Sequence, residues 1–252
     1  MRELLADAWT VMQKEMRELV ATRSSSPSGM IIIVSVVLFL GIIMPLQAGA
    51  GWLEQPWLLS LWAWLPVFLV ATIVADSVAG ERERHTLETL LASRLPDRAI
   101  LLGKVGAAVV YGWGLMLITI LVSILAINLV SAREQLLLYR PVLLIGGGLL
   151  SLLTSVLAAL FGVLVSLRAD SVRRAQQIIT TTLMTIFVAH VLAAPLLFGV
   201  LPERWQHLLE SLSSAFDRVE VVGALALVLV GVNVTLLALA GIWFQRNRLH
   251  LD

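Results

Sequence analysis

The sequence predicts an all-α integral membrane protein with six transmembrane helices, and three observations support this. Hydrophobic residues make up 59% of the 252-residue chain and charged residues only 14%, whereas about a quarter of the residues of soluble domains are charged. The apolar residues form long continuous runs without strand-like alternation, which favours helices over a barrel. Lys and Arg also gather in alternate connections, as they do in multi-pass membrane proteins.

Six apolar runs approach or exceed the roughly 20 residues that a helix needs to cross the hydrocarbon layer. They are Gly29–Gln47, Trp57–Ala79, Val105–Val130, Pro141–Leu167, Ala175–Val200 and Val219–Phe244. Fourteen of the eighteen Lys and Arg residues fall on one side of these spans. The bias predicts a multi-pass protein of the cell (inner) membrane with both termini in the cytoplasm. Residues 1–28 precede a single transmembrane domain, 29–252.

The first 28 residues predict an amphipathic helix that lies in the membrane surface. Apolar residues recur at helical spacing on one face: Leu5, Ala8, Trp9, Met12, Met16, Leu19 and Val20. Asp7, Lys14, Arg17 and Glu18 fall on the other face, and Ser24–Gly29 then turns the chain into the first span. This helix could serve only as a membrane anchor, or it could be a lever that contacts a partner protein.

The connection between the second and third spans, residues 80–104, holds nine charged residues. Thr86 is a plausible N-cap of a short helix whose apolar edge contains Leu87, Leu90 and Leu91. Pro96 should end this helix, and Asp97 should begin the helix that continues into the third span. The pattern fits a docking element for a soluble partner and a solvated linker equally well. Metal binding by Glu81, Glu83 and Glu88 is disfavoured, since their Arg neighbours indicate surface ion pairs.

A third polar segment, residues 201–218, lies on the predicted outer side between the fifth and sixth spans. Its apolar residues share one helical face: Trp205, Leu208, Leu209, Leu212 and Phe216. The segment is too short and too polar to span, so it predicts an amphipathic or re-entrant element at the outer end.

Signatures of catalysis are missing from the sequence. It contains no cysteine, no HExxH or GxSxG motif and no phosphate-binding loop. The chain is therefore predicted to be no enzyme, with no catalytic residue, metal site or cofactor of its own. A net charge of +1 also excludes a generally basic surface for nucleic acid.

Few polar side chains lie deep in the predicted spans. His190, Asn233 and Thr181 are the candidates for lining a transport pathway, although for His190 a hydrogen-bonded packing role is favoured over a substrate-facing one. An alternative is an ion-coupled secondary transporter that uses His190 and Asp76. A second alternative is a membrane scaffold that transports nothing.

Small residues recur about every fourth position along the fourth span: Gly147, Ser151, Ser155, Ala158 and Gly162. Such a stripe lets helix backbones approach closely. It could pack inside the bundle or against another subunit.

One stretch resembles a known family. The order E-R-E-R-x-T-L-E-x-L-L-A-S, followed by D-R-x-I-L-L-G-K, is similar to the connection between spans two and three in permease subunits of ABC-2 type exporters. The matching residues are Glu81, Arg82, Glu83, Thr86, Leu87, Glu88, Leu90, Leu91, Gly103 and Lys104. The basic tail from Phe244 to Asp252 and the layout of spans also resemble that family. His85 departs from it where glycine is common, as does Arg94 where proline is common.

The resemblance implies a division of labour between chains. Two permease subunits, identical or related, form the pathway in the bilayer, and two separate ATPase subunits that use Mg-ATP bind beneath them. The segment Glu81–Leu95 would be the coupling helix that docks on the ATPase. The implied coupling residues are Glu81, Arg82, Glu83, Arg84, Thr86, Leu87, Glu88, Leu90 and Leu91.

Overall fold

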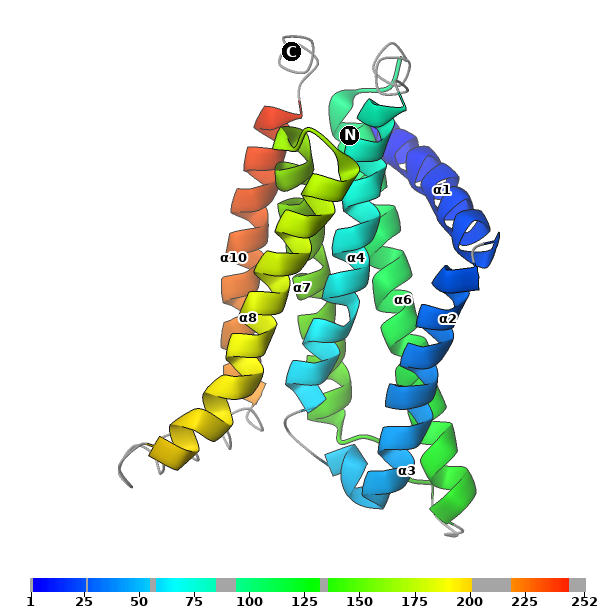
Figure 1. Ribbon diagram of the computed structural model, residues 1–252, viewed down its shortest axis with the longest axis vertical. Coiled ribbons are helices and arrows are strands. Elements are labelled where there is room, and N and C mark those ends of the chain that lie inside the picture. The colour runs from blue at the N-terminus through cyan, green and yellow to red at the C-terminus, as the bar shows by residue number, and fades with distance from the viewer. Residues whose placement is uncertain are drawn as a thin grey trace.

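The structure is a computed structural model that describes residues 2–25, 27–54, 58–84, 94–131, 136–200 and 219–244. Over these residues it is a bundle of long helices without a β-strand (Figure 1). In chain order the elements are α1 (Arg2–Ser25), α2 (Pro27–Leu38), the π-helix η1 (Phe39–Ile43), α3 (Met44–Ala48), the 3-10 helix η2 (Gly49–Glu54), α4 (Leu58–Glu83), α6 (Asp97–Ser131), α7 (Pro141–Arg168), α8 (Val172–Val200) and α10 (Val219–Trp243).

Five stretches of the described chain are long and apolar enough to cross a membrane: Met30–Glu54, Leu61–Glu83, Asp97–Val130, Pro141–Arg168 and Val219–Trp243. They correspond to the first four predicted spans and the sixth. The predicted fifth span coincides with α8, which runs beside the other long helices (Figure 1). That α8 crosses the membrane stays a prediction.

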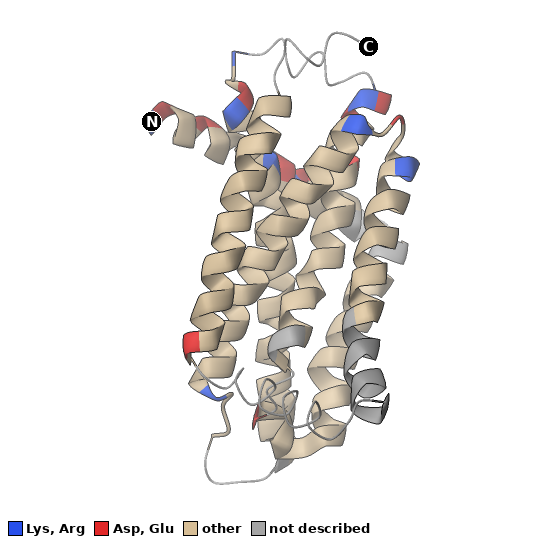
Figure 2. Cartoon of the chain, turned by 90° about the vertical axis from the view of Figure 1, so that its left-hand side faces the viewer, with Lys and Arg blue, Asp and Glu red and all other residues tan. Residues whose placement is uncertain are grey.

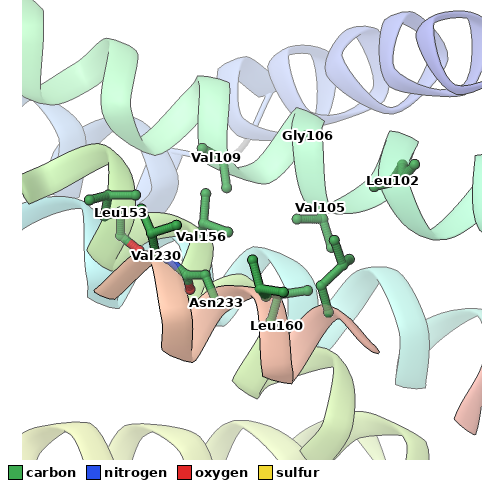
Figure 3. A pocket seen from close by; sticks show the side chains of 11 residues that line it. Leu102, Val105, Gly106, Val109, Leu153, Val156, Leu160, Val230 and Asn233 are labelled. Atoms are coloured by element: carbon green, nitrogen blue, oxygen red, sulfur yellow. Dashed lines mark hydrogen bonds between the residues drawn. The ribbon is translucent and has the colours of Figure 1, made fainter. Parts of the chain in front are cut away.

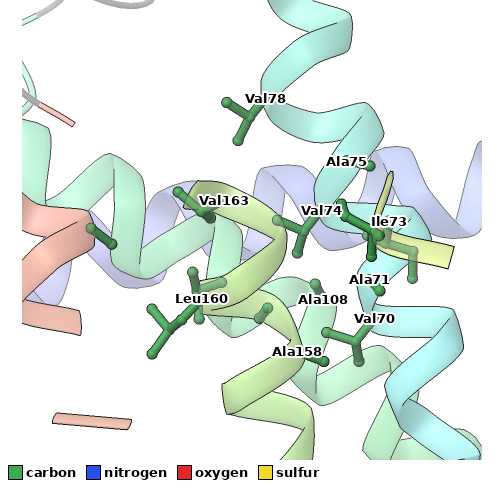
Figure 4. Close-up of a cluster of buried hydrophobic side chains, with 14 of the residues drawn as sticks. Val70, Ala71, Ile73, Val74, Ala75, Val78, Ala108, Ala158, Leu160 and Val163 are labelled. Atoms are coloured by element: carbon green, nitrogen blue, oxygen red, sulfur yellow. The ribbon is translucent and has the colours of Figure 1, made fainter. Parts of the chain in front are cut away.

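The core lies between α4, α6, α7 and α8. Figure 4 shows its centre, where Val70 and Val74 of α4 face Ala158 and Val163 of α7, with Ala108 of α6 beside them. Thr154 Oγ1 of α7 also donates a hydrogen bond to the Ala63 carbonyl of α4 at 2.7 Å. Apolar side chains gain little by leaving lipid for protein, so close packing and such hydrogen bonds must hold the helices together.

The first span is interrupted where it crosses α6. η1 widens the helix around Gly41, and a Cβ at that position would come within 3.1 Å of Val122 Cγ1 and 3.3 Å of the Thr119 carbonyl oxygen. The single π-turn therefore places a residue without a side chain against α6. Beyond it, α3 and η2 turn the chain toward the start of α4 (Figure 1).

Charged residues gather at one end of the bundle, the end where α1 lies (Figure 2). We call it the charged end; it contains Glu15, Glu81, Lys104, Arg168 and Arg174. At the opposite end lie η2, the start of α7 and the start of α10 (Figure 1). This distribution agrees with the Lys and Arg bias of the sequence.

At the charged end, one helix boundary differs from the sequence prediction and one agrees with it. The second span was expected to end at Ala79, but α4 continues to Glu83, so Glu81, Arg82 and Glu83 belong to its last turn. α6 begins at Asp97 directly after Pro96, as the sequence predicts. The predicted coupling residues Thr86, Leu87, Glu88, Leu90 and Leu91, and the outer segment 201–218, lie outside the described residues.

The opposite end is fastened by a buried tyrosine. Trp52 Nε1 of η2 donates to the Tyr139 hydroxyl at 2.9 Å, and the Tyr139 and Ser123 hydroxyls are 2.7 Å apart. The Trp62 ring of α4 meets the Tyr139 ring edge-on, with centroids 6.4 Å apart. Burial raises the pKa of Tyr139, against the opposing effect of its two hydrogen bonds. One side chain thus joins η2, α4 and α6 to the segment that leads into α7.

Replacing Tyr139 with Phe should lower the free energy of unfolding by about 1–3 kcal/mol, because the buried Trp52 indole loses its acceptor. Thermal unfolding of the purified chain measures the effect. The chain's other tyrosine gives a matched control: Tyr111→Phe should leave the midpoint unchanged, since its hydroxyl makes no hydrogen bond among the described residues. Equal midpoints for the two variants would contradict the assignment.

Candidate functional site: a charged junction at the end of α4

The last turn of α4 carries Glu81, Arg82 and Glu83, and each side chain contacts a different part of the bundle. We call these three residues and their partners the junction. The undescribed residues 85–93 follow it directly, so the junction is the point at which the predicted coupling segment joins the transmembrane helices.

Arg82 closes the end of α7. Its guanidinium donates to the carbonyl oxygens of Ala169 at 3.0 Å, Leu167 at 3.0 Å and Ser166 at 3.4 Å. The last carbonyls of a helix have no partner within the helix and carry its negative dipole end. A planar cation with several donors satisfies both requirements, so Arg82 binds α4 to the end of α7.

Glu83 caps the N-terminal end of α8. Its Oε1 accepts a hydrogen bond from the backbone N–H of Val172 at 2.8 Å. The first N–H groups of a helix lack acceptors, and a carboxylate is favoured there by the positive end of the dipole. Adjacent residues of opposite charge thus hold the C-terminus of α7 and the N-terminus of α8.

Glu81 faces the other side of α4, where Lys104 of α6 is buried. The Lys104 ammonium donates to Glu81 Oε1 at 2.8 Å, to Glu15 Oε1 of α1 at 2.9 Å and to the Ser77 carbonyl at 3.1 Å. Only 1% of the Lys104 side chain is exposed, against 10% for Glu15 and 12% for Glu81. All three ammonium protons have acceptors, as a buried charge requires.

A further cation lies beside this cluster. Lys14 Nζ is 3.7 Å from Glu15 and 3.3 Å from Glu18. Partial burial lowers the pKa of Lys14, but the carboxylates of Glu15 and Glu18 outweigh this effect and raise it above the ordinary value. Lys14 therefore stays charged, and its charge offsets the excess of carboxylate around Lys104.

Arg84 is exposed and forms an ion pair at the surface. Its guanidinium lies 3.8 Å from Asp76, with 60% and 54% of the two side chains exposed. A Cβ at Gly80 would come within 2.8 Å of both side chains, so the pair extends over a glycine. Exposed pairs of this kind contribute only about 0–1 kcal/mol. Asp76, the proposed proton carrier of the alternative transporter, is thus an ion-pair partner near the charged end.

The interpretation of these acidic residues as surface ion pairs is therefore wrong for Glu81. Its carboxylate pairs with a buried lysine from another helix, and Glu83 binds a backbone N–H instead of a side chain. Arg82 likewise donates hydrogen bonds to backbone carbonyls at the end of α7, and these partners could not be predicted from a sequence pattern. Sequence reasoning also missed Glu15. The sequence does contain a signal for it. Glu15 lies one helical turn from Val11 and one from Leu19, so its carboxylate falls on the same helix face as these two apolar residues.

The pathway candidates do not come together. Asn233 is buried, and its Nδ2 donates to the Leu153 carbonyl of α7 at 2.9 Å, while its Oδ1 has no hydrogen-bond partner among the described residues. Thr181 is exposed on α8, where its carbonyl accepts from Thr185 Oγ1 at 2.8 Å. α8 includes His190, whose side chain lies outside the described set.

Asn233 lines an apolar cleft between α6, α7 and α10 (Figure 3). The cleft has a volume of about 340 Å³ and is otherwise lined by Leu102, Val105, Gly106, Val109, Leu153, Val156, Leu160, Val230, Val234 and Leu237. Apart from Asn233 every lining residue is apolar. This is a surface suited to a hydrocarbon chain, and it lacks the paired ionisable groups of a proton relay.

The stripe of small residues on α7 is buried within this single chain: Gly147, Ser151, Ser155, Ala158 and Gly162. At Gly162 an added Cβ would lie 3.3 Å from Val74 Cγ1 of α4. In this structure the stripe therefore packs inside the bundle, and among the described helices α4 and α7 share the most extensive contact.

The comparison with protein families identifies the chain. A family model described as ABC-2 family transporter protein matches residues 55–214, nearly two thirds of the sequence, and this range includes the whole junction except Glu15. The chain belongs to the ABC-2 transporter family. It is a multi-pass membrane protein and the permease component of an ABC transporter, a class whose membrane component is not an enzyme and associates with ABC ATPases. No curated protein matches the chain.

The contacts of Arg82 predict a difference between two neighbouring arginines of this permease. Arg82→Gln should lower the free energy of unfolding by about 2 kcal/mol, because charge-assisted bonds to three carbonyls are lost. Arg84→Gln removes an equal charge from an exposed pair and should change it by less than about 1 kcal/mol. Hydrogen exchange should locate the effect at Val165–Val172. Similar behaviour of the two variants would mean that Arg82 does not hold α7.

Proposed function

We propose that this chain is the permease subunit of an ATP-driven exporter and that it couples to separate ATPase subunits through the segment Glu81–Leu95. One observation carries the proposal: three consecutive residues at the start of that segment bind three other helices of the bundle and, through Lys104, α1. A segment that only linked two spans would need none of these contacts.

The two ends of the undescribed stretch support this role. Residues 85–93 leave from the end of α4 and return to Arg94, three residues before α6 begins. A displacement of the stretch therefore acts on α4 and α6 directly, on α7 through Arg82 and on α8 through Glu83. ATP-bound and ATP-free states of a docked ATPase favour different positions of such an element, and this difference drives the transition.

The exposed face of α8 supports a pathway between two permease subunits. Gln177, Thr180, Thr181 and Thr185 are exposed there, while Ala175, Ile179 and Leu183 of the same helix are buried in the core. Polar groups at membrane depth face water or protein and avoid lipid. A second permease, identical or related, would shield this face, with Thr181 toward the pathway; Asn233 packs against α7 instead.

The proposed orientation places the charged end and both termini in the cytoplasm of the cell-membrane protein. Because the chain has no cysteine, single cysteines can report it without background. Arg94→Cys, at the charged end, should react with a membrane-impermeant maleimide only after cells are permeabilised. Leu136→Cys, which replaces a side chain 71% exposed at the opposite end, should react in intact cells. The reverse pattern would overturn the proposal.

The docking role is tested at Leu90, on the predicted apolar edge of the segment. Leu90→Asp should release the ATPase, or abolish ATP-dependent transport, while membrane insertion stays normal, because a carboxylate cannot enter an apolar groove without a partner. Co-purification with the ATPase and ATP hydrolysis by the complex are the measurements. Leu136→Asp is the matched control at the opposite end. Wild-type ATPase binding by Leu90→Asp would refute the docking role.

A further inference from the structure

The helix α1 is held to the same buried lysine as the end of α4. Lys104 Nζ lies 2.9 Å from Glu15 of α1 and 2.8 Å from Glu81 of α4. A lysine side chain with 1% exposure cannot exchange either carboxylate for water without opening the helix contact. The middle of α1 and the end of α4, which are separated in sequence by the whole first span, are thus fixed relative to one ammonium group.

The backbone of α1 is also unusually close to α6 at this point. A Cβ at Gly103 would come within 2.5 Å of Val11 Cβ and 2.9 Å of the Ala8 carbonyl oxygen, and one at Gly106 within 3.1 Å of Met12 Sδ. Both glycines flank Lys104 on α6. Only the absence of side chains allows α1 to lie near enough for Glu15 to reach the lysine.

This contact face of α1 overlaps the predicted apolar face only in part. Ala8 of the predicted face is buried together with Val11 and Glu15, and Met12, Met16 and Leu19 are half-buried. Leu5, Trp9 and Val20 of the predicted face are instead 59%, 57% and 51% exposed. Trp9 and Val20 each follow an inward-facing residue by one position, or about 100° around the helix. One side of α1 therefore binds α6, and an adjacent apolar side remains for the membrane surface.

We propose that Glu15 is a positioning residue for ATPase coupling: through Lys104 it fixes the end of α4, so that α1 and the coupling segment present to the ATPase as one unit. The inference rests on the proposed docking role of Glu81–Leu95. It assigns α1 a part in coupling beyond that of a membrane anchor. The same helix supplies a comparison residue, since Glu18 is exposed by 59% and pairs only with Lys14 in the described structure.

Of the three charged residues in the Lys104 cluster, Glu15 is the one to substitute, because its loss leaves no unpaired buried charge. Removing Lys104 would leave two buried carboxylates facing each other, and the chain would then fail to fold. Removing the Glu15 carboxylate leaves the Lys104–Glu81 pair neutral and intact. Glu15→Gln keeps an oxygen acceptor without the charge, and Glu15→Ala removes both, so the two variants form a graded series.

The test measures the affinity of the purified permease variants for the ATPase subunit that co-purifies with the wild-type chain. Glu15→Ala should weaken binding by roughly 5- to 100-fold, the range typical of coupled sites, and Glu15→Gln should lie between it and wild type. Glu18→Ala should bind as wild type does. Tyr139→Phe serves as the stability control, because it destabilises the bundle at the opposite end and should leave the affinity unchanged.

The outcomes separate this inference from the function on which it rests. If Leu90→Asp weakens ATPase binding and Glu15→Ala does not, α1 has no part in coupling and only the inference fails. If Glu18→Ala or Tyr139→Phe weakens binding as much as Glu15→Ala, the effect is general loss of structure and the inference is equally wrong. If Leu90→Asp itself binds normally, the docking role fails first.

Discussion

The arrangement of the charged end depends on a single buried ammonium group. Lys104 is surrounded by protein and must have acceptors for its three protons, because breaking a buried ion pair costs about 3–5 kcal/mol. The acceptors come from α1 and from two turns of α4. Lys104 therefore requires α1, α4 and α6 to meet at one point, and the close approach at Gly103 makes that meeting possible. Arg82 and Glu83 can reach the ends of α7 and α8 only because α4 is fixed there.

Polar contacts at the two ends of the bundle enclose an apolar middle. In lipid, apolar helices gain little from associating, so polar contacts and close packing of small residues determine which helices are neighbours. Tyr139 joins four segments at one end, and the junction joins five helices at the other. Between them, α4 and α7 pack through alanines and Gly162. A force applied at the charged end would therefore move these helices together.

The sequence was sufficient for the features that depend on composition and periodicity. Continuous apolar runs gave five of the spans, and Pro96 with Asp97 located the start of α6, because these signals are local. The charged cluster was located but its contacts were misjudged. Whether Glu81 pairs with a neighbouring arginine or with Lys104 depends on how α4 and α6 cross, which local patterns do not encode. The apolar face of α1 was predicted only in part for the same reason. Glu15 is polar, and it is buried only because it pairs with Lys104, 89 positions away.

The pairing of glycine with lysine at residues 103 and 104 shows how one short motif can serve two physical needs. A lysine alone on a membrane helix would carry its charge to the lipid interface along a flexible stem. A glycine alone would only let another helix approach. Side by side they bring a helix backbone to within contact distance and provide the charge that its carboxylate must meet. This permease is not itself an enzyme, so a movement of its helices must be driven from outside the chain. Such a movement reaches the rest of the bundle only if flexible side chains do not take it up. A buried and fully hydrogen-bonded lysine, backed by a glycine contact, is the least flexible form in which that charge can be held.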